Sequence, residues 1–311
     1  MENGYTVSTE IPPGYSPDYH PFIFNRPDHL SLQGGDWVHF YLLRKISQKI
    51  IASVAFQIQK TIAKSPLRAP FGSFHFSERL SPEDLFEFVQ RCESQLRKKG
   101  AKTIVLTEPP LFYRKTGELF HAILFNLDYR ISCAELSSGI RIGREAFEEK
   151  IDSWEKRKLK QARSRGVRYK TIPIGKLEMV YGFLEKCREQ KGHRLSMTLQ
   201  ELTDTVAQFN DAFILSGTFL QKELIAASIA IRVHPDILYN FYAGHMKKYD
   251  SISPMVTLTS GLYKFCAQNQ IHLLDLGTST INGKPNFGLL DFKLRLGAVP
   301  SMKLTFEKEL L

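Results

Sequence analysis

The sequence contains two copies of one arrangement of expected strands and helices, and this repetition constrains the fold more than any other feature. The clearest matching pair is residues 51–58 and residues 226–233. Both runs are rich in β-branched residues and alternate small with larger side chains, which is typical of strands packed on both faces. Each run is followed by a second extended segment, over residues 67–76 in the first copy and 237–243 in the second.

The remaining elements recur in the same order. Each copy has a Ser-Pro pair that opens a helix, Ser81-Pro82 and Ser253-Pro254, because serine caps a helix and proline is favoured at its first position. A strand, a helix and a closing strand follow, expected at residues 103–106, 118–127 and 130–136 in the first copy and at 271–276, 289–296 and 302–306 in the second. This order predicts an α/β fold of the mixed α+β kind. Helices would pack on a mixed sheet whose central strands are parallel.

The length agrees with a duplication. At roughly 150 residues per domain, 311 residues correspond to two domains. We expect the boundary near residue 142, which gives a first domain over residues 1–141 and a second over 142–311. The second domain opens with a helix expected at residues 147–165, followed along the chain by the second copy of the pattern.

Positive charge is concentrated in that opening helix. The chain has 42 Lys and Arg against 32 Asp and Glu, a net charge of +10, and eight of the basic residues fall between positions 156 and 170. A basic excess suits nucleic acid, a phosphorylated substrate or a membrane surface, and it is also compatible with simple solubility. We expect the basic helix 156–165 to contact a polyanion, or else to form a solvated face. The contact residues would be Lys156, Arg157, Lys160 and Arg163.

Several classes of site and location are disfavoured. The four cysteines, Cys92, Cys133, Cys187 and Cys266, form no CxxC motif, so we expect free thiols and no metal centre. Residues 1–21 lack a basic segment followed by an apolar one, and no run reaches the roughly 18 apolar residues of a membrane span. We therefore expect a cytoplasmic protein.

Three stretches of the sequence carry a resemblance to a known family. They are the basic segment 156–167, the strand 239–244 with the sequence YNFYAG, and the region 275–297, which begins DLG and continues GLLDFK to a final LG. Together they resemble the FemABX-type family, tandem-GNAT acyl and aminoacyl transferases of bacteria. The resemblance implies two GNAT-like domains in tandem. It also implies transfer of an acyl group from acyl-CoA or aminoacyl-tRNA to a small-molecule or peptide-like amine, with tRNA as one partner that it allows.

One departure concerns the donor. GNAT enzymes that bind coenzyme A typically carry a glycine-rich loop before the central helix, where backbone amides hold the pyrophosphate. The corresponding residues here are 79–82 and 250–254, and neither segment is glycine-rich. Ser251 and Ser253 are expected to bind phosphate instead.

The resemblance also implies roles for individual residues. Lys293 matches the lysine of the family's F-K motif, next to Phe292, and would stabilise a developing oxyanion or hold a tRNA phosphate. The alternative is a solvated lysine on a helix. Tyr242 would position or protonate a leaving group, with Tyr239 beside the donor, although tyrosines are also common in strands.

A polar loop is expected at the carboxyl end of the strand 271–276, where ligands gather in open α/β sheets. Its candidate binding residues are Asp275, Thr278, Ser279 and Asn286, with Asn282 in the same loop. Ordinary turn chemistry would also explain these residue types. Likewise, the aromatic run 71–76 fits either a substrate cleft or the core of a sheet.

A second function remains open. A catalytically silent, GNAT-like binding protein would keep the duplicated fold and use the basic helix 156–165 for an anionic partner. No Ser-His-Asp or Cys-His constellation indicates a covalent enzyme intermediate, so the enzyme hypothesis rests on direct attack by the acceptor amine.

Overall fold

The computed structural model describes residues 4–281 and 283–310, and these residues form two compact units. One unit comprises residues 1–136 together with 301–311, and the other comprises residues 137–300. The boundaries expected from the sequence, 1–141 and 142–311, stay a prediction about where independently folding domains end. No helix in the described part of the chain is long and apolar enough to cross a membrane.

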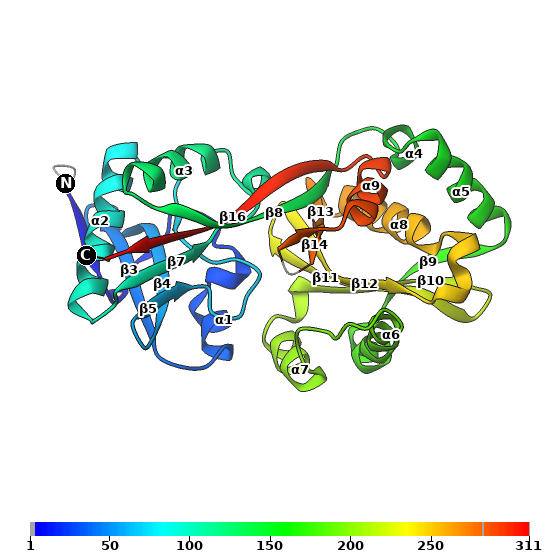
Figure 1. Cartoon of the computed structure of the whole chain (residues 1–311), viewed down its shortest axis with the longest axis horizontal. Helices are drawn as coiled ribbons and strands as arrows, with labels where there is room; N and C mark the ends of the chain where they lie inside the picture. The colour runs from blue at the N-terminus through cyan, green and yellow to red at the C-terminus, as the bar shows by residue number, and fades with distance from the viewer. Residues whose placement is uncertain (1–3, 282, 311) are drawn as a thin grey trace. The chain divides into compact units, whose positions relative to one another are not determined.

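The first unit is a mixed sheet with the strand order β1–β3–β4–β5–β7–β16 (Figure 1). Strands β5 and β7 are parallel, whereas β3, β4 and β5 form an antiparallel meander. The elements are β1 (Tyr5–Ser8), β2 (Ser16–Pro17), α1 (Pro27–Leu32), β3 (Trp37–Arg44), β4 (Lys49–Gln59), β5 (Ile62–Ser65), β6 (His75–Phe76), α2 (Pro82–Lys98), β7 (Thr103–Thr107), α3 (Gly117–Asn126) and β8 (Arg130–Arg141).

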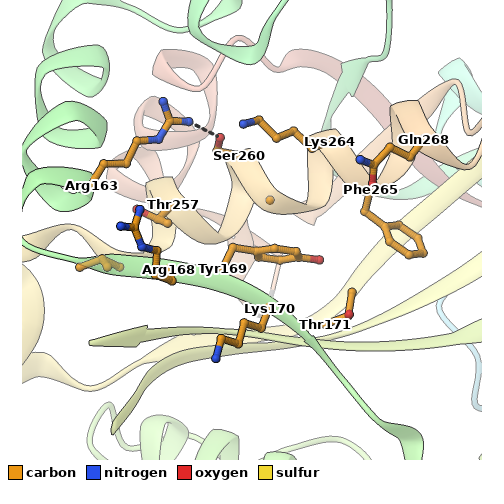
Figure 2. A pocket seen from close by; sticks show the side chains of 12 residues that line it. Arg163, Arg168, Tyr169, Lys170, Thr171, Thr257, Ser260, Lys264, Phe265 and Gln268 are labelled. Carbon is orange, nitrogen blue, oxygen red and sulfur yellow. Dashed lines mark hydrogen bonds between the residues drawn. The ribbon is translucent and has the colours of Figure 1, made fainter. Parts of the chain in front are cut away.

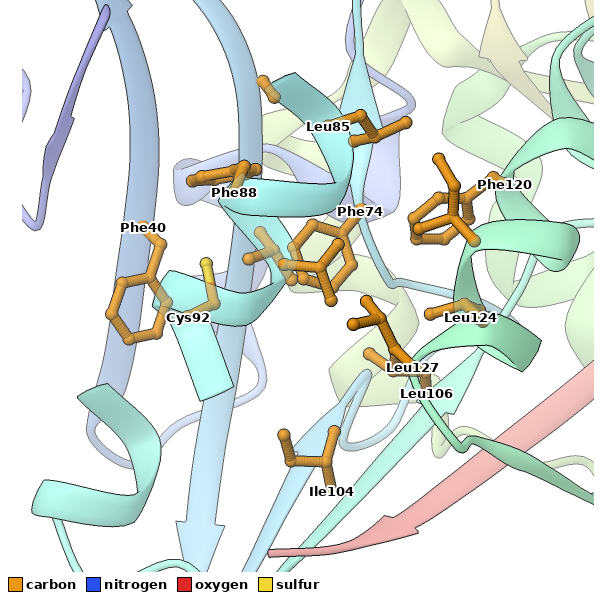
Figure 3. Close-up of a cluster of buried hydrophobic side chains, with 14 of the residues drawn as sticks. Phe40, Phe74, Leu85, Phe88, Cys92, Ile104, Leu106, Phe120, Leu124 and Leu127 are labelled. Carbon is orange, nitrogen blue, oxygen red and sulfur yellow. The ribbon is translucent and has the colours of Figure 1, made fainter. Parts of the chain in front are cut away.

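The core of this unit lies between the sheet and helices α2 and α3. Figure 3 shows Phe88 of α2, Phe120 of α3 and Leu106 of β7 in one apolar cluster, which also contains Phe74. The aromatic run 71–76 therefore belongs to the core, because Phe71, Phe74 and Phe76 are all at most 6% exposed. Helix α2 begins as predicted: the Ser81 side chain accepts a hydrogen bond from the backbone of Asp84.

The second unit is built on the strand order β8–β13–β12–β11–β10–β9. Helix α8 covers one face of this sheet and helices α6 and α7 cover the other (Figure 1). The elements are α4 (Phe147–Lys150), α5 (Ser153–Ser164), β9 (Val167–Ile172), α6 (Leu177–Glu189), α7 (Leu199–Gln208), β10 (Phe213–Leu220), β11 (Glu223–His234), β12 (Ile237–His245), α8 (Pro254–Gln268), β13 (Leu273–Thr278), β14 (Thr280–Ile281), β15 (Lys284–Pro285) and α9 (Phe287–Arg295). The last strand, β16 (Val299–Glu309), belongs to the first unit from residue 301 onwards.

Three sequence expectations differ from the structure. The helix expected over 147–165 is broken into α4 and α5, because Asp152 caps α5 by accepting a hydrogen bond from the backbone of Glu155 at 2.8 Å. The strand expected over 67–76 is mostly loop. The closing strand 302–306 pairs with β7 in the first unit's sheet, whereas residues 137–141 of β8 pair with β13 in the second. Alternation predicts a strand but does not say which sheet it joins.

Candidate active site

Strands β12 and β13 of the second unit run side by side and then part. Their parallel ladder joins residues 237–239 to residues 273–275. Beyond this point β12 continues to His245 paired with β11, and β13 continues to Thr278 paired with β8. We call this divergence the β12–β13 fork. Because ligands of open α/β sheets bind where parallel strands end or diverge, the fork is the candidate site.

The backbone of β13 bulges at the fork. Its pairing with β8 moves from Asp275 opposite Gly139 to Thr278 opposite Ser137, and Gly277 takes a φ of +76°, where glycine is unstrained. The Asp275 carboxylate is 1% exposed. Its Oδ1 accepts hydrogen bonds from the Gly277 backbone at 2.7 Å and from Ser137 Oγ at 3.2 Å. The carboxylate therefore fixes the shape of the bulge.

A buried ammonium group lies against this bulge. Lys293 of α9 is 5% exposed, and its Nζ donates to the carbonyl oxygens of Gly277 and Thr278, each at 2.8 Å. Burial lowers the pKa of Lys293 to about 8, although the charge of Asp275 acts in the opposite direction. These two carbonyls use two of the three N–H donors of an ammonium group. The structure thus excludes the alternative of a solvated Lys293.

Two buried hydroxyls near the bulge have no hydrogen-bond partner among the described residues. They are the Oγ atoms of Ser138 on β8 and Ser279 after β13, in side chains that are 0% and 2% exposed. Buried polar atoms are normally paired with protein, water or ligand. Ser279 directly follows β13 at the fork, so its hydroxyl suits a polar ligand there, whereas Ser138 lies on β8, on the side of β13 away from β12. Ser279 was expected from the sequence. Ser138 was not, because only strand pairing brings β8 to this place.

Tyr239 and Tyr242 lie on one face of β12, on the side of α6 and α7. Between these two tyrosines, β12 has one more residue than the segment of β11 with which it pairs. This β-bulge places both rings on the same face of the strand. A Cβ atom built on Gly277 would lie 3.3 Å from Cε2 of Tyr239, so this ring touches the fork. The Tyr242 hydroxyl instead bonds Ser196 Oγ at 2.6 Å and accepts from the Met197 backbone at 3.0 Å, and burial raises its pKa.

The serines expected to bind phosphate lie at the start of α8. Ser251 is exposed, and Ser253 is the N-cap residue with a φ of 52° and no side-chain capping bond. Asp250, just before them, lies 2.6 Å from His245 Nε2 through its Oδ1. This carboxylate is unfavourable to a second anion at the helix N-terminus. No described hydrogen bond links either serine to Lys293 or Asp275.

The other predicted residues of the loop are structural in this arrangement. Asn286 caps α9, since its Oδ1 accepts from the Leu289 backbone at 3.1 Å. Phe292 packs against the apolar cluster that contains Ile140 and Phe147. Asn282 lies outside the described residues. Of the predicted set, the structure therefore brings together Lys293, Asp275, Thr278, Ser279 and Tyr239.

The basic helix α5 is solvent-exposed along the predicted contact face. Lys156, Arg157 and Lys160 are exposed, whereas Arg163 is half-buried and pairs with Glu148 at 2.5 Å. Trp154, which is 53% exposed, carries the Arg157 guanidinium over its ring at 5.1 Å. On the buried side Glu155 accepts from Arg295 Nε of α9 at 3.0 Å. Helix α5 is thus anchored to the helix that carries Lys293.

The corresponding place in the first unit is filled by its own chain. There the parallel pair is β5 and β7, joined up to Ser65 opposite Leu106. Beyond it, the Gly72 backbone donates to Thr107 O at 3.0 Å and the Ser73 backbone to Ser65 Oγ at 2.9 Å. Segment 72–73 therefore bridges the two strand ends. A buried pair, Glu108 and Arg114 at 2.5 Å, supports it, since Arg114 also donates to Phe74 O at 2.8 Å.

No protein-family model and no curated protein matches the sequence. Solved structures do match. FemX has a TM-score of 0.69 at 11% identity, covering 93% of each chain. The C-terminal domain of a putative lysylphosphatidylglycerol synthetase from Agrobacterium fabrum has a TM-score of 0.58 at 13% identity, covering 91% of this chain and 87% of that one.

A tandem GNAT protein from the clavulanic acid biosynthesis pathway also matches, with a TM-score of 0.53 at 10% identity, covering 91% of this chain and 87% of that one. Identities this low establish the fold alone. The predicted α/β fold with two GNAT-like domains is confirmed by these likenesses.

Proposed function

We propose that the protein is an acyltransferase that moves an acyl or aminoacyl group from acyl-CoA or aminoacyl-tRNA to the amine of a small-molecule or peptide-like acceptor. The observation that carries the proposal is the buried Lys293 ammonium, held at the bulge where β12 and β13 part. The fold shared with FemX and with a tandem GNAT protein supports the same reaction class.

The proposed chemistry needs little beyond orientation and charge. The acceptor amine attacks the carbonyl carbon of the donor, a C–N bond forms, and the C–S bond of a thioester or the C–O bond of an aminoacyl ester breaks. The departing thiolate of coenzyme A or ribose oxygen of tRNA takes up the proton that the amine loses. The ammonium of Lys293 would stabilise the negative charge that develops on the carbonyl oxygen. The Ser279 hydroxyl, which has no partner among the described residues, would bind the donor.

The remaining predicted residues fit this scheme in supporting roles. Asp275 would keep the bulge in shape and Lys293 charged, because its carboxylate raises the pKa that burial lowers. Tyr239 would line the fork. Tyr242 stays a predicted catalytic residue, but its hydroxyl already bonds Ser196 and Met197, which favours a positioning role.

The proposal is tested by a transfer assay with acetyl-CoA, longer acyl-CoAs and aminoacyl-tRNA as donors and a panel of amines as acceptors. We expect Lys293→Ala to lower kcat/KM about 100-fold, the usual effect of removing one oxyanion donor. Lys222→Ala, which removes an exposed lysine from the turn between β10 and β11, is the matched control and should change little. Undiminished kcat/KM in Lys293→Ala would remove this residue from the mechanism.

The same assay separates the enzyme from the alternative, a non-catalytic protein that contacts a polyanion through α5. Stabilisation by an acyl-CoA together with turnover supports ordinary acyl transfer. Salt-sensitive stabilisation by tRNA with no transfer from any donor would support the binding protein instead.

A further inference from the structure

A second polar pocket lies within the unit of residues 137–300, between α5, β9 and α8 (Figure 2). Its volume is about 660 Å³. It shares no lining residue with the β12–β13 fork, and none of the side chains that line it is acidic. Three elements contribute cations to it: Arg163 from α5, Arg168 from β9 and Lys264 from α8.

The three cations surround a pair of hydroxyls. Arg163 donates to Ser260 Oγ at 3.2 Å, and Figure 2 shows the Lys264 ammonium directed towards the same hydroxyl. Arg168 and Thr257 line the same pocket, and the Arg168 side chain extends from β9 towards α8. Lys170 of β9 also lines the pocket. Its ammonium, however, points away from the two hydroxyls and lies 5.8 Å from the ring centre of Phe219.

The pocket carries more positive charge than its surroundings neutralise. Glu148 pairs with Arg163 at 2.5 Å. Burial alone would raise the pKa of Glu148, but its hydrogen bonds to the backbone and Arg163, with the charge of Lys264, lower it. One carboxylate therefore faces three cations, and the excess is about two positive charges. A phosphomonoester at neutral pH carries about −1.5 to −2.

The floor of the pocket holds a buried hydroxyl that lacks a partner. Thr257 is 5% exposed, and its Oγ1 has no hydrogen-bond partner among the described residues. A hydroxyl in this position would be satisfied by an acceptor oxygen of a bound group. Arginine and lysine supply the charge-assisted donors that phosphate oxygens favour.

We propose that this pocket binds a terminal phosphomonoester of a ligand, through Arg168, Lys264 and Arg163, with Thr257 and Ser260 as hydroxyl partners. The identity of that ligand rests on the proposed function, because both donor classes carry such a group. Coenzyme A has a 3′-phosphate on its ribose, and tRNA has a 5′-terminal phosphate. The shared chemistry is the dianionic phosphate, and the source is decided by experiment.

The test uses two pairs of probes that differ by one phosphomonoester: coenzyme A with dephospho-coenzyme A, and tRNA with its 5′-dephosphorylated form. Dissociation constants are measured for the full chain, for Arg168→Gln/Lys264→Gln, and for Lys170→Gln. Arg168 and Lys264 are exposed side chains, so the double variant should keep the fold. Lys170→Gln removes a charge from the same strand, but one whose ammonium is directed away from the Ser260 and Thr257 hydroxyls.

We expect the wild-type protein to bind the phosphorylated member of one pair about tenfold more tightly, and the double variant to lose this preference while Lys170→Gln keeps it. The pair that shows the preference identifies the source. The proposal is overturned if neither pair shows a difference, if the double variant keeps it, or if Lys170→Gln loses it equally. Transfer activity without a phosphate preference would overturn this proposal alone, whereas a preference without activity would overturn the proposed transferase alone.

Discussion

At the scale of single residues, the site depends on a cation that burial makes costly. Lys293 is 5% exposed and is held by two backbone carbonyls rather than by direct contact with a carboxylate. Lysine is rarely buried without a partner group. Burying this positive charge at a fixed place lowers the stability of the folded chain. Charged groups buried at such a cost are typical of functional sites.

This cost predicts a specific pH dependence. The pKa of Lys293 falls from 10.5 to about 8 on folding, so between these pH values the unfolded chain holds a proton that the folded chain has released. The free energy of unfolding should therefore rise with pH across this window. We expect wild type to gain up to about 3 kcal/mol relative to Lys293→Met between pH 7 and pH 10.5. Urea unfolding of both proteins across this range measures it, and a pH-independent difference would contradict the burial of the charge.

At the scale of elements, the bulge of β13 joins the parts of the site. Asp275, Gly277 and Thr278 lie within four residues, and each contributes a hydrogen bond that shapes the bulge or holds Lys293. The fork itself follows from strand pairing, because β8 takes the side of β13 that faces away from β12. The site is thus built from β8, β12, β13 and α9, of which β8 is distant in sequence from the other three.

The bulge can be tested through its glycine. Gly277→Ala combines a positive φ with a Cβ atom 3.3 Å from Tyr239 Cε2. Gly166→Ala has a similar φ of +83° with nothing within 4 Å, so it reports backbone strain alone. We expect both variants to lose about 1 kcal/mol of stability, and only Gly277→Ala to lower kcat/KM, by about tenfold or more. Equal kcat/KM values in the two variants would show that the shape of the bulge does not affect catalysis.

Helix α5 supplies a prediction of a different kind, on salt dependence. If Lys156, Arg157 and Lys160 contact nucleic-acid phosphates, replacing all three with Gln should make the slope of log K against log salt less negative by about 2 to 3. The matched control replaces Lys176, Lys186 and Lys222, which are exposed elsewhere in the same unit. Filter binding with tRNA at several salt concentrations gives both slopes. An unchanged slope for the α5 variant would show that this face is merely solvated.

The sequence predicted the regular elements better than the contacts between them. The runs 51–58 and 226–233 lie within β4 and β11, because alternation of small and large side chains is a local signal. The break at Asp152 is also local, but a single capping residue decides it. Ser137 and Ser138 carried no signal at all, since only strand pairing brings β8 beside β13, where Ser137 reaches Asp275 across 138 positions. Lys293 was identified by resemblance, and its burial could not be read from the helix pattern.

At the scale of the whole molecule, the two units share a topology but differ at the place where a ligand would bind. In the unit of residues 137–300 the parallel strands diverge, and polar groups without partners among the described residues lie beside the divergence. In the other unit, segment 72–73 bridges the corresponding strand ends, with Glu108 and Arg114 buried beside it. The two units thus differ at this place: the chain itself bridges the strand ends in one unit, and the strands diverge without such a bridge in the other.

This asymmetry leads to the most direct test of the account, which is hydrogen–deuterium exchange of the full chain with and without its acyl donor or a donor analogue. The account predicts slower exchange in residues 239–246 and 274–281, on either side of the β12–β13 fork, and no change in residues 62–65 and 103–107 of the first unit. Protection at the ends of β5 and β7, or unchanged exchange at the fork in a complex that is saturated with donor, would contradict it.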